Sequence, residues 1–64
     1  MDSYIQHELD SCIVELYSIA RELENVANEI RASIQGMNTN KYTKDLEKCA
    51  DKYRKAARRL EKIH

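Results

Sequence analysis

The chain has almost none of the residues that interrupt helices. Among its 64 residues there is no proline, and the single glycine is Gly36. Proline breaks helix interiors, and glycine is the residue best able to take the left-handed conformation that ends a helix. Only the stretch Gly-Met-Asn-Thr-Asn, residues 36–40, has the composition of a turn. We therefore expect one turn at about residues 35–40, with Gly36 as its turn residue and a long helix on each side.

The chain also lacks the residue clusters that carry catalysis. There is no glycine-rich phosphate loop, and His7 and His64 lie near opposite ends of the sequence. Glu8 and Asp10 are two residues apart, so on a helix they point to different sides and form no acid pair. Two thiols without a nearby histidine pair do not make a zinc site. We expect no enzymatic activity, no catalytic residue, no metal site and no cofactor.

Cysteine is scarce, and its placement argues against a disulfide. Cys12 and Cys49 are the only two cysteines, and both fall where a small apolar side chain would pack. In an antiparallel hairpin they lie about fourteen residues, or roughly 20 Å, apart along the helices. A disulfide needs Cα atoms within about 7 Å. We expect reduced core thiols, which fits a reducing cytosol.

No long hydrophobic run is present. Met1 is followed by acidic and polar residues, so we see no signal peptide, and charge interrupts the apolar pattern at every turn, which argues against membrane insertion. Nucleic-acid binding is not expected either, because an acidic half accompanies the basic one and no aromatic residues interleave with the basic residues. The expected location is the cytoplasm, with room for later export by a route that uses no cleaved leader.

The pattern that is present is an apolar repeat with alternating steps of four and three residues, which places all its members on one side of a helix. The stripe is widened by small or apolar residues at 13, 20, 27, 34, 50 and 57. The repeat comprises Ile5, Leu9, Cys12, Leu16, Ile19, Leu23, Val26 and Ile30, then Tyr42, Leu46, Cys49, Tyr53, Ala56, Leu60 and Ile63.

These observations predict an all-α protein with a single domain over residues 1–64, folded as an antiparallel two-helix hairpin. The first helix is expected at about 3–34, opened by a capping box of Ser3 and Gln6, and the second at about 40–63. One hairpin covers only one side of so wide a stripe, and a lone hairpin is near balance in stability. We therefore expect a protein partner that completes a four-helix bundle, as a homodimer or as a heterodimer with another helical protein.

The residues expected to bind the partner are the larger members of the stripe. They are Leu9, Ile13, Leu16, Ile19, Leu23, Val26, Ile30, Ile34, Leu46, Tyr53 and Leu60.

Charge is distributed unevenly along the chain. Residues 1–35 carry seven acids and two arginines, whereas residues 36–64 carry nine bases and four acids. Opposite charge favours contact between the two halves, either within one chain or between two copies, and disfavours parallel pairing of identical helices.

The turn region resembles that of the WXG (ESAT-like) family, the small helical hairpins of type VII secretion. Ile34-Gln35-Gly36 stands where the family has Trp-x-Gly, and the apolar spacing on both sides is similar over residues 16–63. The family's export signal, Tyr-x-x-x-Asp/Glu, is absent after the second helix, since Tyr53 is followed four residues later by Ala57. The resemblance implies a non-enzymatic partner or targeting subunit for a type VII secretion substrate.

A second resemblance concerns the first helix. The stretch from Ile5 to Ile13, which contains Glu8, Leu9 and Asp10, resembles the Ser-Gln-Glu-Leu-Asp motif of small hairpin phosphatases that act on response regulators. In that family the motif lies on the second helix, whereas here it lies on the first. The alternatives to a secretion partner are therefore a small regulator that binds or dephosphorylates a response regulator, and another phage or bacterial helical adaptor or inhibitor.

Overall fold

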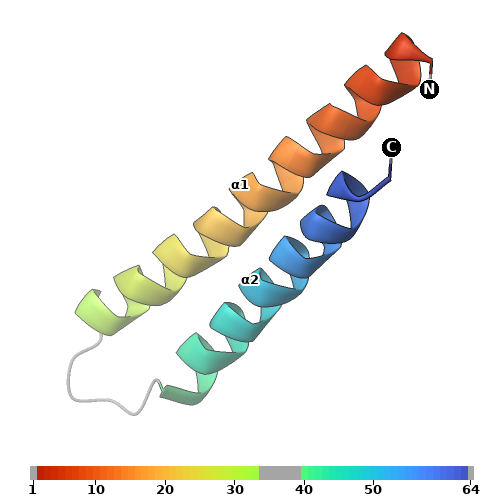
Figure 1. Cartoon of the computed structure of the whole chain (residues 1–64). Helices are drawn as coiled ribbons and strands as arrows, with labels where there is room; N and C mark the ends of the chain where they lie inside the picture. Colours follow the sequence, from red (N-terminus) through yellow and green to blue (C-terminus); the bar gives the residue numbers. More distant parts are fainter. Residues whose placement is uncertain (1, 34–39, 64) are drawn as a thin grey trace.

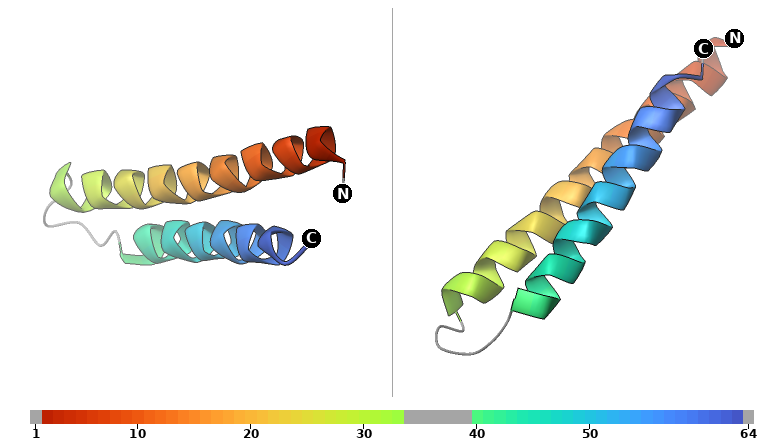
Figure 2. Two further views of the ribbon diagram at one scale, coloured as in Figure 1. Left: turned by 45° about the horizontal axis from the view of Figure 1, so that its top comes forward. Right: turned by 60° about the horizontal axis from the view of Figure 1, so that its bottom comes forward.

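Two helices make up the fold: α1 (Ser3–Ser33) and α2 (Asn40–Glu61). The computed structural model describes residues 2–33 and 40–63. The helices lie side by side and run in opposite directions, and the N-terminal turns of α1 extend past the end of α2 (Figures 1 and 2). The molecule is 53 Å long and 15 by 8 Å in cross-section. The expected all-α antiparallel hairpin is confirmed.

The N-terminus of α1 is capped by Asp2. Its carboxylate Oδ1 accepts a hydrogen bond from the backbone N–H of Tyr4 at 3.0 Å, and its carbonyl accepts one from the N–H of Gln6 at 2.9 Å. The side-chain bond satisfies one of the N–H groups that a helix start leaves without partners, and the Gln6 bond is the first of the intrahelical bonds. The expected capping box of Ser3 and Gln6 is therefore wrong, because the cap lies one residue earlier and the Gln6 amide bonds to Asp10 instead.

The C-terminal end of α2 comes earlier than expected. The sequence predicted a helix to about residue 63, whereas α2 ends at Glu61. The N–H groups of Lys62 and Ile63 bond to the carbonyls of Arg59 and Leu60, at 3.2 and 3.0 Å. Such bonds to the third preceding residue tighten the last turn of a helix. Ile34 and the predicted turn residue Gly36 lie outside the residues that the structure describes.

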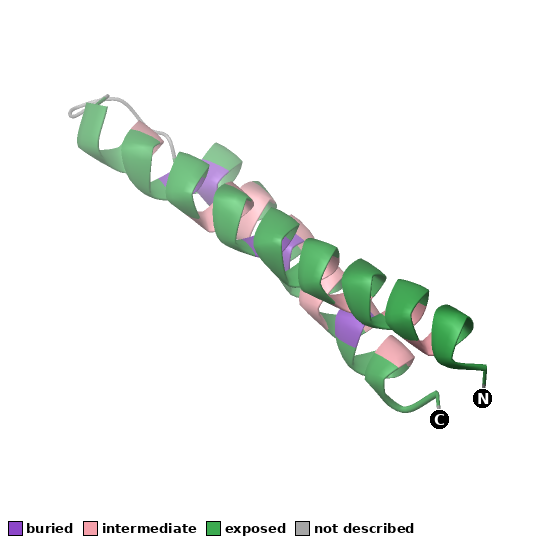
Figure 3. Ribbon diagram, turned by 90° about the horizontal axis from the view of Figure 1, so that it is seen from above, coloured by how far each residue is buried: buried purple, intermediate pink, exposed green. Residues whose placement is uncertain are grey.

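The line of contact between the helices is built on small side chains. Ala20 and Ala27 of α1 and Ala50 and Ala57 of α2 are fully buried, and Thr43 is 1% exposed (Figure 3). The Thr43 hydroxyl donates to the Asn40 carbonyl at 3.1 Å, so its burial leaves no polar atom without a partner. Small residues let two helix backbones approach closely.

Larger side chains flank this line of contact and complete it. The half-buried residues Leu16, Leu23, Leu46 and Leu60 follow the small ones at steps of three and four. Each helix thus presents a row of small residues beside a row of large ones. The wide stripe seen in the sequence is real, and the two helices meet along its alanine side.

Two rows of the predicted repeat lie outside the line of contact between the helices. The rows Ile5, Cys12, Ile19, Val26 and Tyr42, Cys49, Ala56, Ile63 belong to the predicted repeat, yet most of them are exposed. Both thiols are free, but Cys12 is exposed and Cys49 is only half-buried. The expectation that both cysteines pack in a core is therefore wrong in this hairpin. The alanines adjoining these rows allow closer helix approach, so they take the central position instead.

Candidate interaction surface

One edge of the hairpin is closed by polar contacts, and we call it the polar edge. Arg31 donates to Glu47 at 2.6 Å, Arg54 forms an ion pair with Glu24, and the Tyr17 hydroxyl donates to Glu61. Along each helix these contacts recur every seven residues, so they mark one side of the line of contact from end to end. The polar edge consists of Tyr17, Glu24 and Arg31 on α1 and Glu47, Arg54 and Glu61 on α2.

The ion pairs of the polar edge fix register more than they add stability. Their side chains are between 26% and 47% exposed, so water screens them. Surface pairs of this kind contribute about 0.2–1 kcal/mol each. Arg54 also donates to Asp51 at 2.9 Å, which holds its guanidinium in place. The polar edge therefore sets which side chains of α1 and α2 meet, and leaves little there for a partner to satisfy.

The contacts of the polar edge also change the pKa of the Tyr17 phenol. Its hydrogen bond to the Glu61 carboxylate raises the pKa of Tyr17 above its usual value. Partial desolvation and the negative charge of Glu61 act in the same direction, and the positive charge of Arg58 acts weakly against them. Ionising the phenol would remove the donated proton and place two negative charges side by side, which disfavours the phenolate.

The opposite edge of the hairpin is apolar. Because the polar edge occupies one side of the line of contact on both helices, the rows on the other side of that line share the remaining edge. Ile19 is 38% exposed, Val26 44% and Tyr42 65%, although all three are large apolar side chains. The apolar edge consists of Ile5, Cys12, Ile19 and Val26 on α1 and Tyr42, Cys49 and Ala56 on α2, with Ile63 just beyond the end of α2.

The residues predicted to bind a partner divide between two places. Ile19 and Val26 lie on the apolar edge. Ile34 lies outside the part of the chain that the structure describes. The others are half-buried along the line of contact within the hairpin, where α1 and α2 already cover one side of each. These are Leu9, Ile13, Leu16, Leu23 and Ile30 on α1 and Leu46, Tyr53 and Leu60 on α2.

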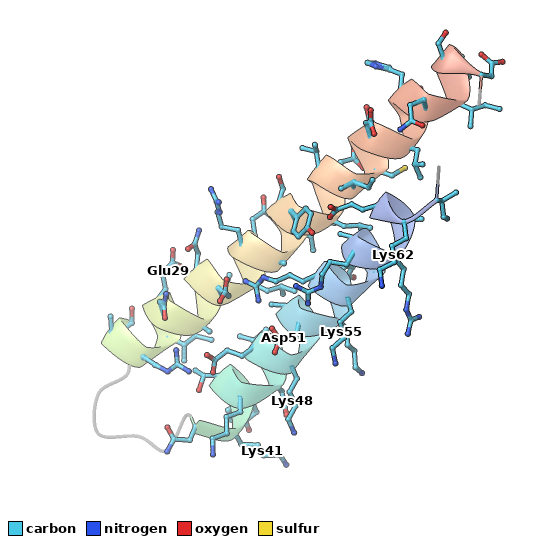
Figure 4. All side chains as sticks on the ribbon, viewed as in Figure 1. Glu29, Lys41, Lys48, Asp51, Lys55 and Lys62 are labelled. Carbon is cyan, nitrogen blue, oxygen red and sulfur yellow. The ribbon has the colours of Figure 1, made fainter. Side chains whose placement is uncertain are left out.

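The outer faces carry charge in rows. Glu8, Glu15, Glu22 and Glu29 recur every seven residues on α1, and all four are exposed. Figure 4 shows Lys41, Lys48, Lys55 and Lys62 following one another along α2 with the same spacing. The seven-residue interval keeps each row at a constant position around its helix. The hairpin therefore has an acidic row on one helix and a basic row on the other.

Reasoning from the sequence missed the polar edge. Tyr17, Glu24 and Arg54 are not among the residues predicted to make contacts, yet they make the contacts that join the two helices. A signal for them was present. Residues 24 and 31 carry opposite charges to residues 54 and 47. Each directly follows a member of the leucine rows, which are Leu9, Leu16, Leu23 and Ile30 on α1 and Leu46, Tyr53 and Leu60 on α2. Comparing the two flanks of the leucine rows would have shown one flank polar on both helices and the other apolar on both.

Features of other kinds of site are not found over residues 2–33 and 40–63. No group of three or more His, Cys, Asp or Glu side chains there is arranged to hold a metal ion. Two hollows lined by Val14 and Tyr17 are open to solvent. Glu8 and Asp10 are exposed, and Asp10 accepts a hydrogen bond from the Gln6 amide at 3.0 Å. Neither described helix is both long enough and apolar enough to span a bilayer.

Comparison with known proteins adds no family assignment. No protein-family model matches the chain, and neither a curated protein nor a solved structure is similar enough to count as a match. The structure alone shows the two-helix hairpin. The resemblance to the WXG family stays a proposal that rests on the sequence.

Proposed function

We propose that the protein is a non-enzymatic helical interaction module that binds a helical protein partner through its apolar edge. The observation that carries this proposal is the difference between the two edges of the hairpin. Side-chain hydrogen bonds and ion pairs close the polar edge, whereas the apolar edge leaves Ile5, Ile19, Val26 and Tyr42 partly in water. A further helix packed against the apolar edge would bury these side chains and so lower the free energy of the complex.

Burying the apolar edge would contribute favourably to binding. Fully burying a side chain such as isoleucine or valine contributes about 1.5–3 kcal/mol, and those of the apolar edge have about half of that contribution still to gain. Ile5, Val26 and Ile63 are between 44% and 53% exposed. A partner helix or helix pair placed over the edge would bury them and convert the hairpin into a bundle.

In its finer form, the proposal is a WXG-like partner or targeting subunit of a type VII secretion substrate. Its support is the antiparallel hairpin together with Ile34-Gln35-Gly36 at the position of the family's Trp-x-Gly. Those three residues lie outside the described part of the chain, so this form rests on the sequence resemblance. If the apolar edge is occupied, the charged outer faces and the helix ends are the surfaces left for an escorted substrate.

Site-specific photo-crosslinking in the cells that produce the protein tests the interaction module. One variant carries a photoreactive residue in place of Ile19 on the apolar edge, and the matched control carries it in place of the exposed Ser18. We expect the Ile19 position to yield a defined crosslinked protein species that the Ser18 position does not. Identical patterns at both positions, or no crosslinked protein at Ile19, would contradict the proposal.

The mass of the crosslinked species separates the finer alternatives. A larger helical protein would support the secretion-partner form. A receiver domain would support the response-regulator alternative, and a species of twice the chain mass would indicate self-association.

A further inference from the structure

We infer that the partner on the apolar edge is a second copy of this chain, with α1 of each copy packed against α2 of the other. The inference rests on the proposed interaction module and names its partner. A twofold axis parallel to the helices produces this arrangement, in which every helix of the four-helix bundle has antiparallel neighbours.

The shape of the apolar edge suits a hairpin better than a single helix. α1 contributes four residues to it and α2 contributes three, so it is a face two helices wide (Figure 2). A second hairpin offers a face of the same width and the same composition. Pairing two identical faces is the isologous contact typical of twofold dimers.

Charge decides between the two possible twofold arrangements. On α1 the row next to the apolar edge on its outer side is Glu8, Glu15, Glu22 and Glu29; on α2 the equivalent row is Asp45, Lys52 and Arg59. A twofold axis perpendicular to the helices would pack α1 against α1 and bring two acidic rows together. The parallel axis instead places the acidic row of one copy against a row with two bases.

The acidic and basic residues of these two rows also lie at similar positions along the bundle axis. The middle of α1 lies beside the C-terminal half of α2 (Figure 1), and a parallel twofold axis keeps every residue at its own height. Glu15 and Glu22 then come level with Arg59 and Lys52 of the second copy, to within about one helical turn. Asp45 is the one acid in its row, and it is followed one turn later by Lys48 (Figure 4).

The acidic row is available for such contacts. Within the described hairpin, the ion pairs involve Glu24, Glu47 and Asp51, and none involves Glu8, Glu15, Glu22 or Glu29. The apolar edge lies between this row and α2 of the same chain, so the row has no base of its own chain across from it. A second copy supplies bases at that position.

Charge reversal and mixing test both the partner and the orientation. One variant carries Glu15→Lys and Glu22→Lys, and the other carries Lys52→Glu and Arg59→Glu. We expect the wild type to dimerise in sedimentation equilibrium. Each variant alone should have a dimer dissociation constant at least about tenfold higher, because like charges then face each other. Mixing the two variants should restore dimerisation through a heterodimer with opposite charges at both contacts.

A matched control separates position from net charge. The combination Ser11→Lys, Ser18→Lys, Asn25→Lys and Ala32→Lys raises the charge of α1 by the same amount as the first variant, at exposed positions of one seven-residue row away from both edges. We expect it to dimerise as the wild type does at moderate salt. Circular dichroism of each variant at the same dilution shows whether the hairpin is still folded, and recovery on mixing excludes simple misfolding.

Three results would overturn the inference. The first is a wild type that stays monomeric at every concentration. The second is a pair of charge variants that each associate as tightly as the wild type, the result expected if α1 packs against α1. The third is dissociation without recovery on mixing. If the wild type is monomeric while the Ile19 crosslink captures a different protein, the second copy is wrong and the interaction module stands; if that crosslink is absent too, both fail.

Discussion

Single side chains determine how the two helices of this protein meet. Ala20, Ala27, Ala50 and Ala57 are the fully buried apolar residues among those described, and each offers only a methyl group. Because the centre is so small, larger residues at the flanks stay partly in water, and Tyr17 reaches across to Glu61. The hairpin therefore gains little from a deep core and relies on its edges.

The phenol of Tyr17 gives a test of the polar edge. Its pKa is raised by the bond to Glu61, so we expect its phenolate to form at higher pH than that of an ordinary tyrosine. A raised pKa means that this bond stabilises the fold below the unfolded tyrosine pKa of about 10 and ceases to do so as pH rises through the folded value. A titration of phenolate absorbance on wild type and Tyr17→Phe isolates this group by difference.

The control for this titration is Glu61→Gln. It keeps the shape of the side chain and removes the negative charge, so the pKa of Tyr17 should fall back towards its usual range. A Tyr17 pKa that is the same with glutamate and with glutamine at position 61 would contradict the assigned contact.

The helices themselves follow from local signals. The scarcity of glycine and proline lets each run without interruption, and the arginines near the ends of both α1 and α2 suit the helix dipole. The first cap differs from expectation. Ser3 was predicted to cap α1, but Asp2 does so with a carboxylate, which interacts more strongly with the positive end of a helix than a hydroxyl does.

Removing each candidate cap distinguishes Asp2 from Ser3. Asp2→Ala should destabilise the first turn of α1 by about 1 kcal/mol, because the Tyr4 N–H loses its acceptor. Amide hydrogen exchange at Tyr4 and Gln6 measures this loss and should speed up several-fold. The matched variant Ser3→Ala should leave both rates close to wild type. Faster exchange in Ser3→Ala than in Asp2→Ala would show that the capping box is formed after all.

The whole molecule is a thin, amphipathic hairpin. It measures 53 by 15 by 8 Å, and its two edges differ in kind, one polar and joined across the helices, the other apolar and open. A lone pair of helices with a methyl-lined centre has little margin of stability. Covering the apolar edge adds the missing burial, so we expect folding and association to be linked.

Paired substitutions separate the contact within the hairpin from the apolar edge. Leu23→Asp places a charge on the half-buried line of contact, so we expect a loss of about 2 kcal/mol or more and a collapse of helical circular dichroism at all concentrations. Ile19→Asp, one turn earlier on the same helix, lies on the apolar edge. It should keep the helicity that the wild type has when dilute and lose association.

The mass in solution by light scattering, measured beside the circular dichroism, completes this comparison. Equal effects of Leu23→Asp and Ile19→Asp on dilute helicity would mean that both residues face α2. That outcome would place the row containing Ile19 in the contact between the two helices.

The sequence by itself determined the two helices and the width of the apolar stripe. These features depend on local propensity and on a repeat of three and four residues, and both can be read without knowing the neighbours of any residue. The leucine rows, with Leu16, Leu23 and Leu60, were placed on the correct side of each helix for the same reason.

Only the tertiary structure decided which flank of the leucine rows faces the other helix. Ile19 and Ala20 are adjacent in sequence and both continue the repeat, so hydrophobicity alone favours the larger one. In the folded hairpin Ala20 is buried and Ile19 is exposed. The choice depends on the distance between two helix axes and on the pairing of Glu24 with Arg54, and both are properties of the assembled pair rather than of either helix alone.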